Sequence, residues 1–119
     1  MEIENLSMPI LPVLPSISDF QKFEIVVAQI KEVKEHPNAD KLYVLKIDVG
    51  TQEKQIVAGI RKSYTPEQLL GKKIIVINNL APVVLRGEES NGMLLAASST
   101  DGSALLMPDK DVPVGTRIK

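Results

Sequence analysis

Residues 43–49 read YVLKIDV, a stretch in which every second residue is large and apolar. Lys46 and Asp48 stand between these apolar positions. A period of two residues is typical of a β-strand that buries one face and leaves the other in water. The stretch therefore predicts a half-buried strand and favours a β-rich fold for the chain around it.

Further strands are predicted on both sides of this one. Four more segments have the apolar character of strands, namely 23–33, 55–59, 74–77 and 93–97. A short helix is predicted between the third and fourth strands, because Thr65 suits an N-cap, Pro66 the first helical position and Gln68 a capping box. Three strands, a helix and two strands is the order of an OB-fold. The prediction is an all-β, five-stranded OB-fold barrel with a short helix between strands 3 and 4.

The two ends of the chain are expected to be extended. Residues 1–17 form an N-terminal segment with three prolines among isolated apolar residues, and residues 18–119 form the barrel domain. A solvated linker is rarely so apolar, so Ile10–Leu14 is a candidate strap that packs against a partner. Residues 104–107 are expected to pair back on the last strand as a hairpin arm.

Composition limits the possible functions. The formal net charge is −1 and the pI is about 5.8, so the chain lacks the basic excess of a general nucleic-acid binder. It has two Phe, two Tyr and no Trp, too few aromatic rings to favour stacking on single-stranded bases. Any RNA ligand is therefore expected to be structured and to be read through its backbone and shape.

The sequence also predicts where the protein works. It has no cysteine, no basic leader with a cleavage site and no apolar run of the roughly 20 residues that a membrane span needs. We expect a cytoplasmic protein of one domain, without disulfides, secretion or contact with a membrane.

Two polar loops are the candidate functional sites. They occupy residues 36–41 and 78–92, which join strands 1–2 and 4–5, and OB-folds bind oligonucleotides through these two loops. In the first loop, Asn38 can cap the turn and Lys41 can reach a phosphate. An alternative is a plain turn with a solvated lysine.

The second loop offers several groups that suit RNA. Arg86 carries a guanidinium fork for phosphate, Ser90 a hydroxyl and Met93 a flexible apolar side chain for a ribose or base. Alternatively, Met93 is the first core residue of strand 5, and Ser90-Asn91 is only a turn. Glu88 and Glu89 would repel phosphate unless they point away. The pair Arg61-Lys62 is the nearest basic assistance.

Catalysis is not favoured. His36, Asp40 and Ser90 could form a triad, but these residue types are common, and no nucleophile elbow or phosphate-binding loop is present. One histidine cannot build a histidine-rich metal site. We expect no catalytic residue, metal or cofactor, and we interpret His36 as a turn residue.

The motifs resemble those of the tRNA-binding domain family. This family includes the C-terminal domain or detached subunit of methionyl-tRNA synthetases, free-standing tRNA-binding proteins and the domain of the endothelial-monocyte-activating polypeptide. The similarity extends over about residues 18–119. The matching segments are His36-Pro37-Asn38-Ala39-Asp40-Lys41-Leu42, Gln55-Ile56-Val57-Ala58-Gly59-Ile60, Tyr64-Thr65-Pro66-Glu67, Asn79-Leu80-Ala81-Pro82, Leu85-Arg86-Gly87 and Ser90-Asn91-Gly92-Met93.

The resemblance implies a non-catalytic OB-fold that binds tRNA by shape and adds tRNA affinity to a methionyl-tRNA synthetase catalytic chain. It also implies a homodimer, joined through the N-terminal strap and the tail at residues 112–118. The implied tRNA-binding residues are Asn38, Lys41, Arg61, Lys62, Arg86, Ser90, Asn91 and Met93. The alternatives are a chaperone-like homodimer of the same fold, which typically lacks both loop motifs, and an inert dimerisation or scaffold module.

Overall fold

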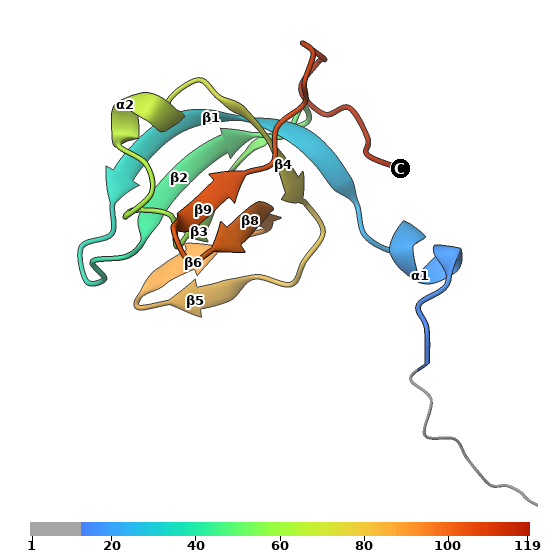
Figure 1. The fold of residues 1–119 in the computed structure, drawn as a ribbon, viewed down its shortest axis with the longest axis horizontal. Helices are drawn as coiled ribbons and strands as arrows, with labels where there is room; N and C mark the ends of the chain where they lie inside the picture. The colour runs from blue at the N-terminus through green and yellow to red at the C-terminus, as the bar shows by residue number, and fades with distance from the viewer. Residues whose placement is uncertain (1–12) are drawn as a thin grey trace, which may run out of the picture.

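The computed structural model describes residues 13–119, and its main element is a strongly curled antiparallel sheet (Figure 1). This sheet has five strands in the order β3-β2-β1-β4-β7. Its strands are β1 (Ile25–Glu35), β2 (Tyr43–Asp48), β3 (Glu53–Ala58), β4 (Lys73–Ile77) and β7 (Met93–Leu94). Strand β1 pairs with both β2 and β4. The register of its pairing with β2 shifts between Ile30 and Glu32. Such a shift bends a strand, as closing a barrel requires. The predicted all-β OB-like barrel is confirmed.

Alternation along the central strands builds the core. Tyr43, Leu45 and Ile47 of β2 point inward and are almost fully buried. They pack against inward-facing residues of the neighbouring strands, which are Val26, Ala28, Ile30, Ile56, Ala58, Ile74 and Val76. The period of two read from residues 43–49 therefore fixes which face of this strand forms the core.

The predicted helix is present as α2 (Pro66–Leu69). Thr65 and Gln68 form both hydrogen bonds of a capping box, as the sequence predicts. Leu69 is completely buried in the core, so the helix closes one end of the barrel (Figure 1). Capping fixes where this short helix begins, and burial of Leu69 holds it on the barrel.

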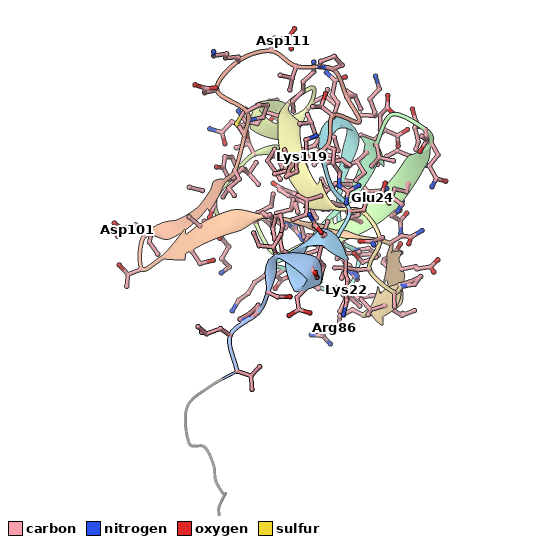
Figure 2. The ribbon with its side chains drawn as sticks, turned by 90° about the vertical axis from the view of Figure 1, so that its right-hand side faces the viewer. Lys22, Glu24, Arg86, Asp101, Asp111 and Lys119 are labelled. Atoms are coloured by element: carbon pink, nitrogen blue, oxygen red, sulfur yellow. The ribbon has the colours of Figure 1, made fainter. Side chains whose placement is uncertain are left out.

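Two hairpins complete the β-structure. The first joins β5 (Val83–Leu85) to β6 (Glu88–Ser90), within the segment that we expected to be a polar loop. That expectation is wrong in this part. The second joins β8 (Ala96–Ser99) to β9 (Gly102–Leu105) and confirms the predicted hairpin, although β8 lies later in the chain than the expected strand at 93–97 and β9 lies earlier than the expected arm at 104–107. Figure 2 shows Asp101 at the tip of this second hairpin, which projects from the barrel.

A short helix begins inside the N-terminal segment that we expected to be extended. Helix α1 (Ile17–Gln21) starts at a capping box between Ser16 and Asp19. The backbone N–H of Ser16 donates to the Asp19 carboxylate, and this bond, followed by the interaction with the Ser16 side chain, holds the pKa of Asp19 below its usual range. Figure 1 shows α1 standing away from the barrel. Of the candidate strap, Ile10 and Leu11 lie outside the described residues.

The C-terminal tail belongs to the barrel itself. Its backbone pairs with β1, since the N–H of Val27 donates to Thr116 and the N–H of Ile118 donates to Ile25. The side chains of Val112 and Ile118 pack on a second small core formed by Ile25, Val27 and Ile75. These tail residues therefore cover the outer side of β1 and β4.

Candidate nucleic-acid interface

The β1–β2 loop (residues 36–42) and the β5–β6 hairpin lie at the same end of the barrel (Figure 1). A pocket of about 410 Å³ is formed between them. Its lining residues are Ala39, Asp40, Lys41, Leu42 and Arg86. The structure thus brings together Lys41 and Arg86, the two cations that the sequence singled out from separate loops. Both are exposed, and neither forms an ion pair within residues 13–119.

Arg86 occupies an unusual backbone conformation. It has φ +54° and the next residue, Gly87, has φ +94°. Positive φ at both central residues is the signature of a type I′ turn, whose twist suits a two-residue hairpin. Asparagine or aspartate is the ordinary first residue of such a turn, and arginine there costs about 1 kcal/mol. Figure 2 shows Arg86 at the edge of the molecule, on the opposite side from Asp111. Strain at an exposed arginine is consistent with a binding role.

Arg61 supports the β1–β2 loop through hydrogen bonds to two of its backbone carbonyls. Its backbone N–H donates to the carbonyl of Lys41 over 3.3 Å, and its Nη1 donates to the carbonyl of Ala39 over 3.2 Å. Its Nη2 lies 3.0 Å from Oε1 of Glu35 in an ion pair. Arg61 is thus half-buried and already satisfied by protein groups. The neighbouring Lys62 is exposed and free of ion pairs among the described residues, so it is the member of this pair that can meet a phosphate.

His36 is buried, with 3% of its surface exposed. Its Nε2 lies 2.9 Å from the carbonyl oxygen of Leu85, and its Nδ1 accepts the N–H of Asn38 over 2.9 Å. The ring therefore links the β1–β2 loop to the β5–β6 hairpin. The sequence offered no sign of this link, because its partner is a backbone carbonyl 49 positions away.

Ser90 and Asn91 close the barrel. The Ser90 hydroxyl accepts the N–H of Val57 over 2.9 Å and donates to the carbonyl of Gly92 over 3.1 Å. The N–H of Asn91 donates to the carbonyl of Gln55 over 2.9 Å. These bonds satisfy the free edge of β3, and Ser90 is 4% exposed. The Ser90 hydroxyl is therefore engaged within the protein both as an acceptor and as a donor.

Asn38 and Met93 are available to a ligand as well as the three exposed cations Lys41, Lys62 and Arg86. Asn38 is exposed, and its backbone N–H donates to Nδ1 of His36. Met93 starts β7 opposite Ile77 and is 47% exposed. Met93 is therefore not a core residue, although it does begin the last strand of the main sheet.

The acidic pair beside this site is partly directed away from it. Strand alternation puts Glu88 and Glu89 on opposite faces of β6. Oε1 of Glu88 accepts a hydrogen bond from Nε2 of Gln55 over 3.3 Å, which holds this carboxylate against β3. Glu89 is exposed. One of the two carboxylates is thus turned toward the barrel wall.

The imidazole of His36 and the hydroxyl of Ser90 are both held by backbone groups of the protein. Within residues 13–119 no three His, Asp or Glu side chains gather in a way that could hold a metal ion. Both ring nitrogens of His36 are hydrogen-bonded to backbone groups, and so is the hydroxyl of Ser90. No helix in the described part of the chain is long and apolar enough to cross a membrane.

A curled five-stranded barrel, with exposed cations on two converging loops, defines a nucleic-acid-binding module of the OB class. Comparison with known families is more specific, since residues 25–117 match the family described as "Putative tRNA binding domain". The chain belongs to this tRNA-binding domain family.

The chain is similar in sequence to a segment of methionyl-tRNA synthetases. It is 53% identical over 104 residues to the methionine–tRNA ligase of Thermococcus kodakarensis, covering 87% of this chain and 14% of that ligase. The chain thus spans about one seventh of the length of that relative. The crystal structure of a MetRS-related protein from Pyrococcus horikoshii is 38% identical, with a TM-score of 0.84, and covers 91% of this chain and 100% of its own.

A chaperone has a similar structure. The CsaA chaperone protein of Picrophilus torridus is 35% identical, with a TM-score of 0.83, over 89% of this chain and 100% of its own. The fold is thus shared by a protein related to a methionyl-tRNA synthetase and by a protein named as a chaperone, so the fold alone assigns neither role.

Proposed function

We propose that this barrel is a non-catalytic module that holds tRNA through its backbone and shape. The observation that carries the proposal is the pocket shared by Lys41 and Arg86, two exposed cations from loops about 45 positions apart. Lys62 adds a third exposed cation beside the β1–β2 loop. Three exposed cations on neighbouring loops are available to contact phosphates of a folded RNA.

The placement of the aromatic residues argues against base stacking as the main mode of binding. Tyr43 is buried and its hydroxyl donates to the carbonyl of Tyr64. Tyr64 accepts the N–H of Leu105 at its own hydroxyl. Phe20 and Phe23 line a groove beside α1. None of the four rings lines the pocket at Lys41 and Arg86, so bases have no platform there.

We further propose that the module adds tRNA affinity to a methionyl-tRNA synthetase, whether in one chain or as a separate subunit. The support is the 53% identity to a segment of the Thermococcus kodakarensis ligase. Catalysis would then belong to the rest of that enzyme. A chaperone role is the second candidate, favoured by the similarity to CsaA and by the exposed apolar residues Val83 and Val84.

Salt dependence tests the phosphate mechanism. If Lys41, Lys62 and Arg86 each neutralise one phosphate, the logarithm of the tRNA association constant falls with the logarithm of salt concentration at a slope of about −2 to −3 per site. The measurement is a series of titrations of labelled tRNA from low to moderate salt. A flat response would remove the phosphate mechanism and leave the chaperone candidate in its place.

We also propose that two copies associate through α1. Ile17 is 75% exposed and Phe20 is 45% exposed on a helix that stands away from the barrel (Figure 1). With Phe23 and Ile118 they line a groove of about 310 Å³. Exposed apolar side chains on α1 and on the neighbouring C-terminal tail suit a self-complementary interface.

Light scattering tests the dimer. We expect the mass of two 13.0 kDa chains for the wild type at micromolar concentration and of one chain for Ile17→Glu, because a carboxylate would be buried at the interface. Ser18→Glu is the control, since it adds the same charge to the next residue of the same helix. A wild-type monomer, or equal masses for Ile17→Glu and the wild type, would rule out this interface.

A further inference from the structure

We propose that His36 is a positioning residue that locks the β1–β2 loop to the β5–β6 hairpin, and so sets the spacing between Lys41 and Arg86. The inference rests on the proposed binding of phosphates by these two cations. A buried imidazole that bonds two separate loops is the observation behind it: Nε2 lies 2.9 Å from the carbonyl oxygen of Leu85, and Nδ1 accepts the N–H of Asn38 over 2.9 Å.

The two hydrogen bonds define the tautomer of the ring. Nδ1 accepts an N–H, so it carries no hydrogen in this arrangement. Nε2 must then carry the ring hydrogen and donate it to the carbonyl of Leu85. One neutral imidazole therefore holds two backbone groups in place, one in each loop.

Apart from its antiparallel pairing with β6, the outer arm of the hairpin has little other support. Its residues Val83, Val84 and Leu85 are exposed by 51%, 69% and 39%, so packing does not fix the position of β5. The other arm is held at β6, where Ser90 bonds to β3 and Gln55 bonds to Glu88 and Glu89. The bond to Leu85 is thus the described side-chain contact nearest to Arg86 on the outer arm.

This arrangement affects binding through preorganisation. A hairpin that moves freely must be ordered when Arg86 meets a phosphate, and that ordering opposes binding. A hairpin already bonded to the β1–β2 loop presents Arg86 and Lys41 together. The contribution of His36 should therefore depend on the presence of Arg86.

Two substitutions separate the two bonds of the ring. The Oδ1 of an asparagine lies near the place of Nδ1, so His36→Asn can keep the bond to Asn38 but is too short to reach Leu85. The Nε2 of a glutamine lies near the place of the ring Nε2, so His36→Gln can keep the bond to Leu85. Each variant is made alone and together with Arg86→Asn.

Titration with tRNA at moderate salt, together with thermal unfolding, is the test. We expect His36→Asn to weaken tRNA binding about threefold to tenfold, which corresponds to the cost of ordering one long side chain on binding. We expect His36→Gln to bind tRNA within about twofold of the wild type. In the Arg86→Asn background, His36→Asn should cause no further loss. A merely structural role predicts equal losses in both backgrounds, and that outcome would overturn the proposal.

The outcomes also distinguish this inference from the proposed function. If Arg86→Asn alone leaves tRNA binding unchanged, the phosphate contact fails and His36 has nothing to position. If Arg86→Asn weakens binding but the His36→Asn losses are equal in both backgrounds, only the positioning role fails.

The wild-type protein provides a second measurement that does not depend on how well the variants fold. Backbone ¹⁵N relaxation of the free protein should give order parameters of about 0.85 at Arg86 and Gly87, the value of a rigid backbone. Values below about 0.6 would show a mobile hairpin and would also overturn the proposal.

Discussion

Replacing Arg86 by asparagine is expected to weaken tRNA binding about tenfold while leaving the barrel at least as stable as the wild type. The loss in binding follows from removing one charge-assisted contact, which contributes about 1.5 kcal/mol. The salt slope should become shallower by about 1, because one fewer phosphate is neutralised. The measurements are tRNA titration at several salt concentrations and urea unfolding.

The stability of Arg86→Asn is expected to be kept or raised because of the type I′ turn at Arg86-Gly87. Arg86 has φ +54°, where asparagine is one of the residues best tolerated in a type I′ turn. Arg86→Asn is therefore expected to lower the affinity for tRNA while the stability of the barrel is kept or raised. Lys110→Asn is the matched control, since it removes one exposed charge at residue 110, next to Asp111 on the side of the molecule opposite Arg86 (Figure 2). Equal losses of binding in both variants would indicate only a general charge effect.

Replacing Ser90 by alanine is expected to reduce the free energy of unfolding by about 1–3 kcal/mol, the cost of leaving a buried donor unpaired. The N–H of Val57 loses its acceptor, and the carbonyl of Gly92 loses a donor. Urea unfolding measures the change. Ser98→Ala is the control, because Ser98 is exposed on β8.

Ser90→Ala also tests which role the hydroxyl has in binding. If Ser90 only positions the hairpin and β7, the variant should keep the wild-type salt slope, because no phosphate contact is removed. Unchanged stability combined with a clear loss of tRNA affinity would contradict this account and would make Ser90 a direct ligand of the RNA.

The sequence predicted the barrel because its signals are local. Alternation at residues 43–49 gives the inward face of β2, and the capping box at Thr65 gives the start of α2. Helix α1 was missed although its signal is of the same kind. Ser16 and Asp19 form a capping box, but only one short turn of helix follows it.

The β5–β6 hairpin was missed because its turn is not built from the usual residues. Arg86-Gly87 takes the place of an asparagine or aspartate before glycine, and each arm has only three residues. The exposure of all of β5 also removes the alternation that reveals a strand. Periodicity therefore carries no information for this element.

The candidate site was predictable in part. Lys41 and Arg86 were identified from their loops, and the structure brings them to one pocket. The internal roles of His36, Arg61 and Ser90 were not predictable, because their partners are mainly backbone groups distant in sequence. No pattern of residue types records such bonds. The polar residues of a binding motif can thus serve to hold its exposed members in place.

The most direct test of the central claim is competition binding with the wild type and Lys41→Ala at moderate salt. The competitors are mixed tRNA, a duplex hairpin and an unstructured RNA of equal length. We predict that tRNA binds clearly best to the wild type and that Lys41→Ala loses that advantage. Equal binding of all three RNAs, or binding of none, would contradict recognition of tRNA shape through these two loops.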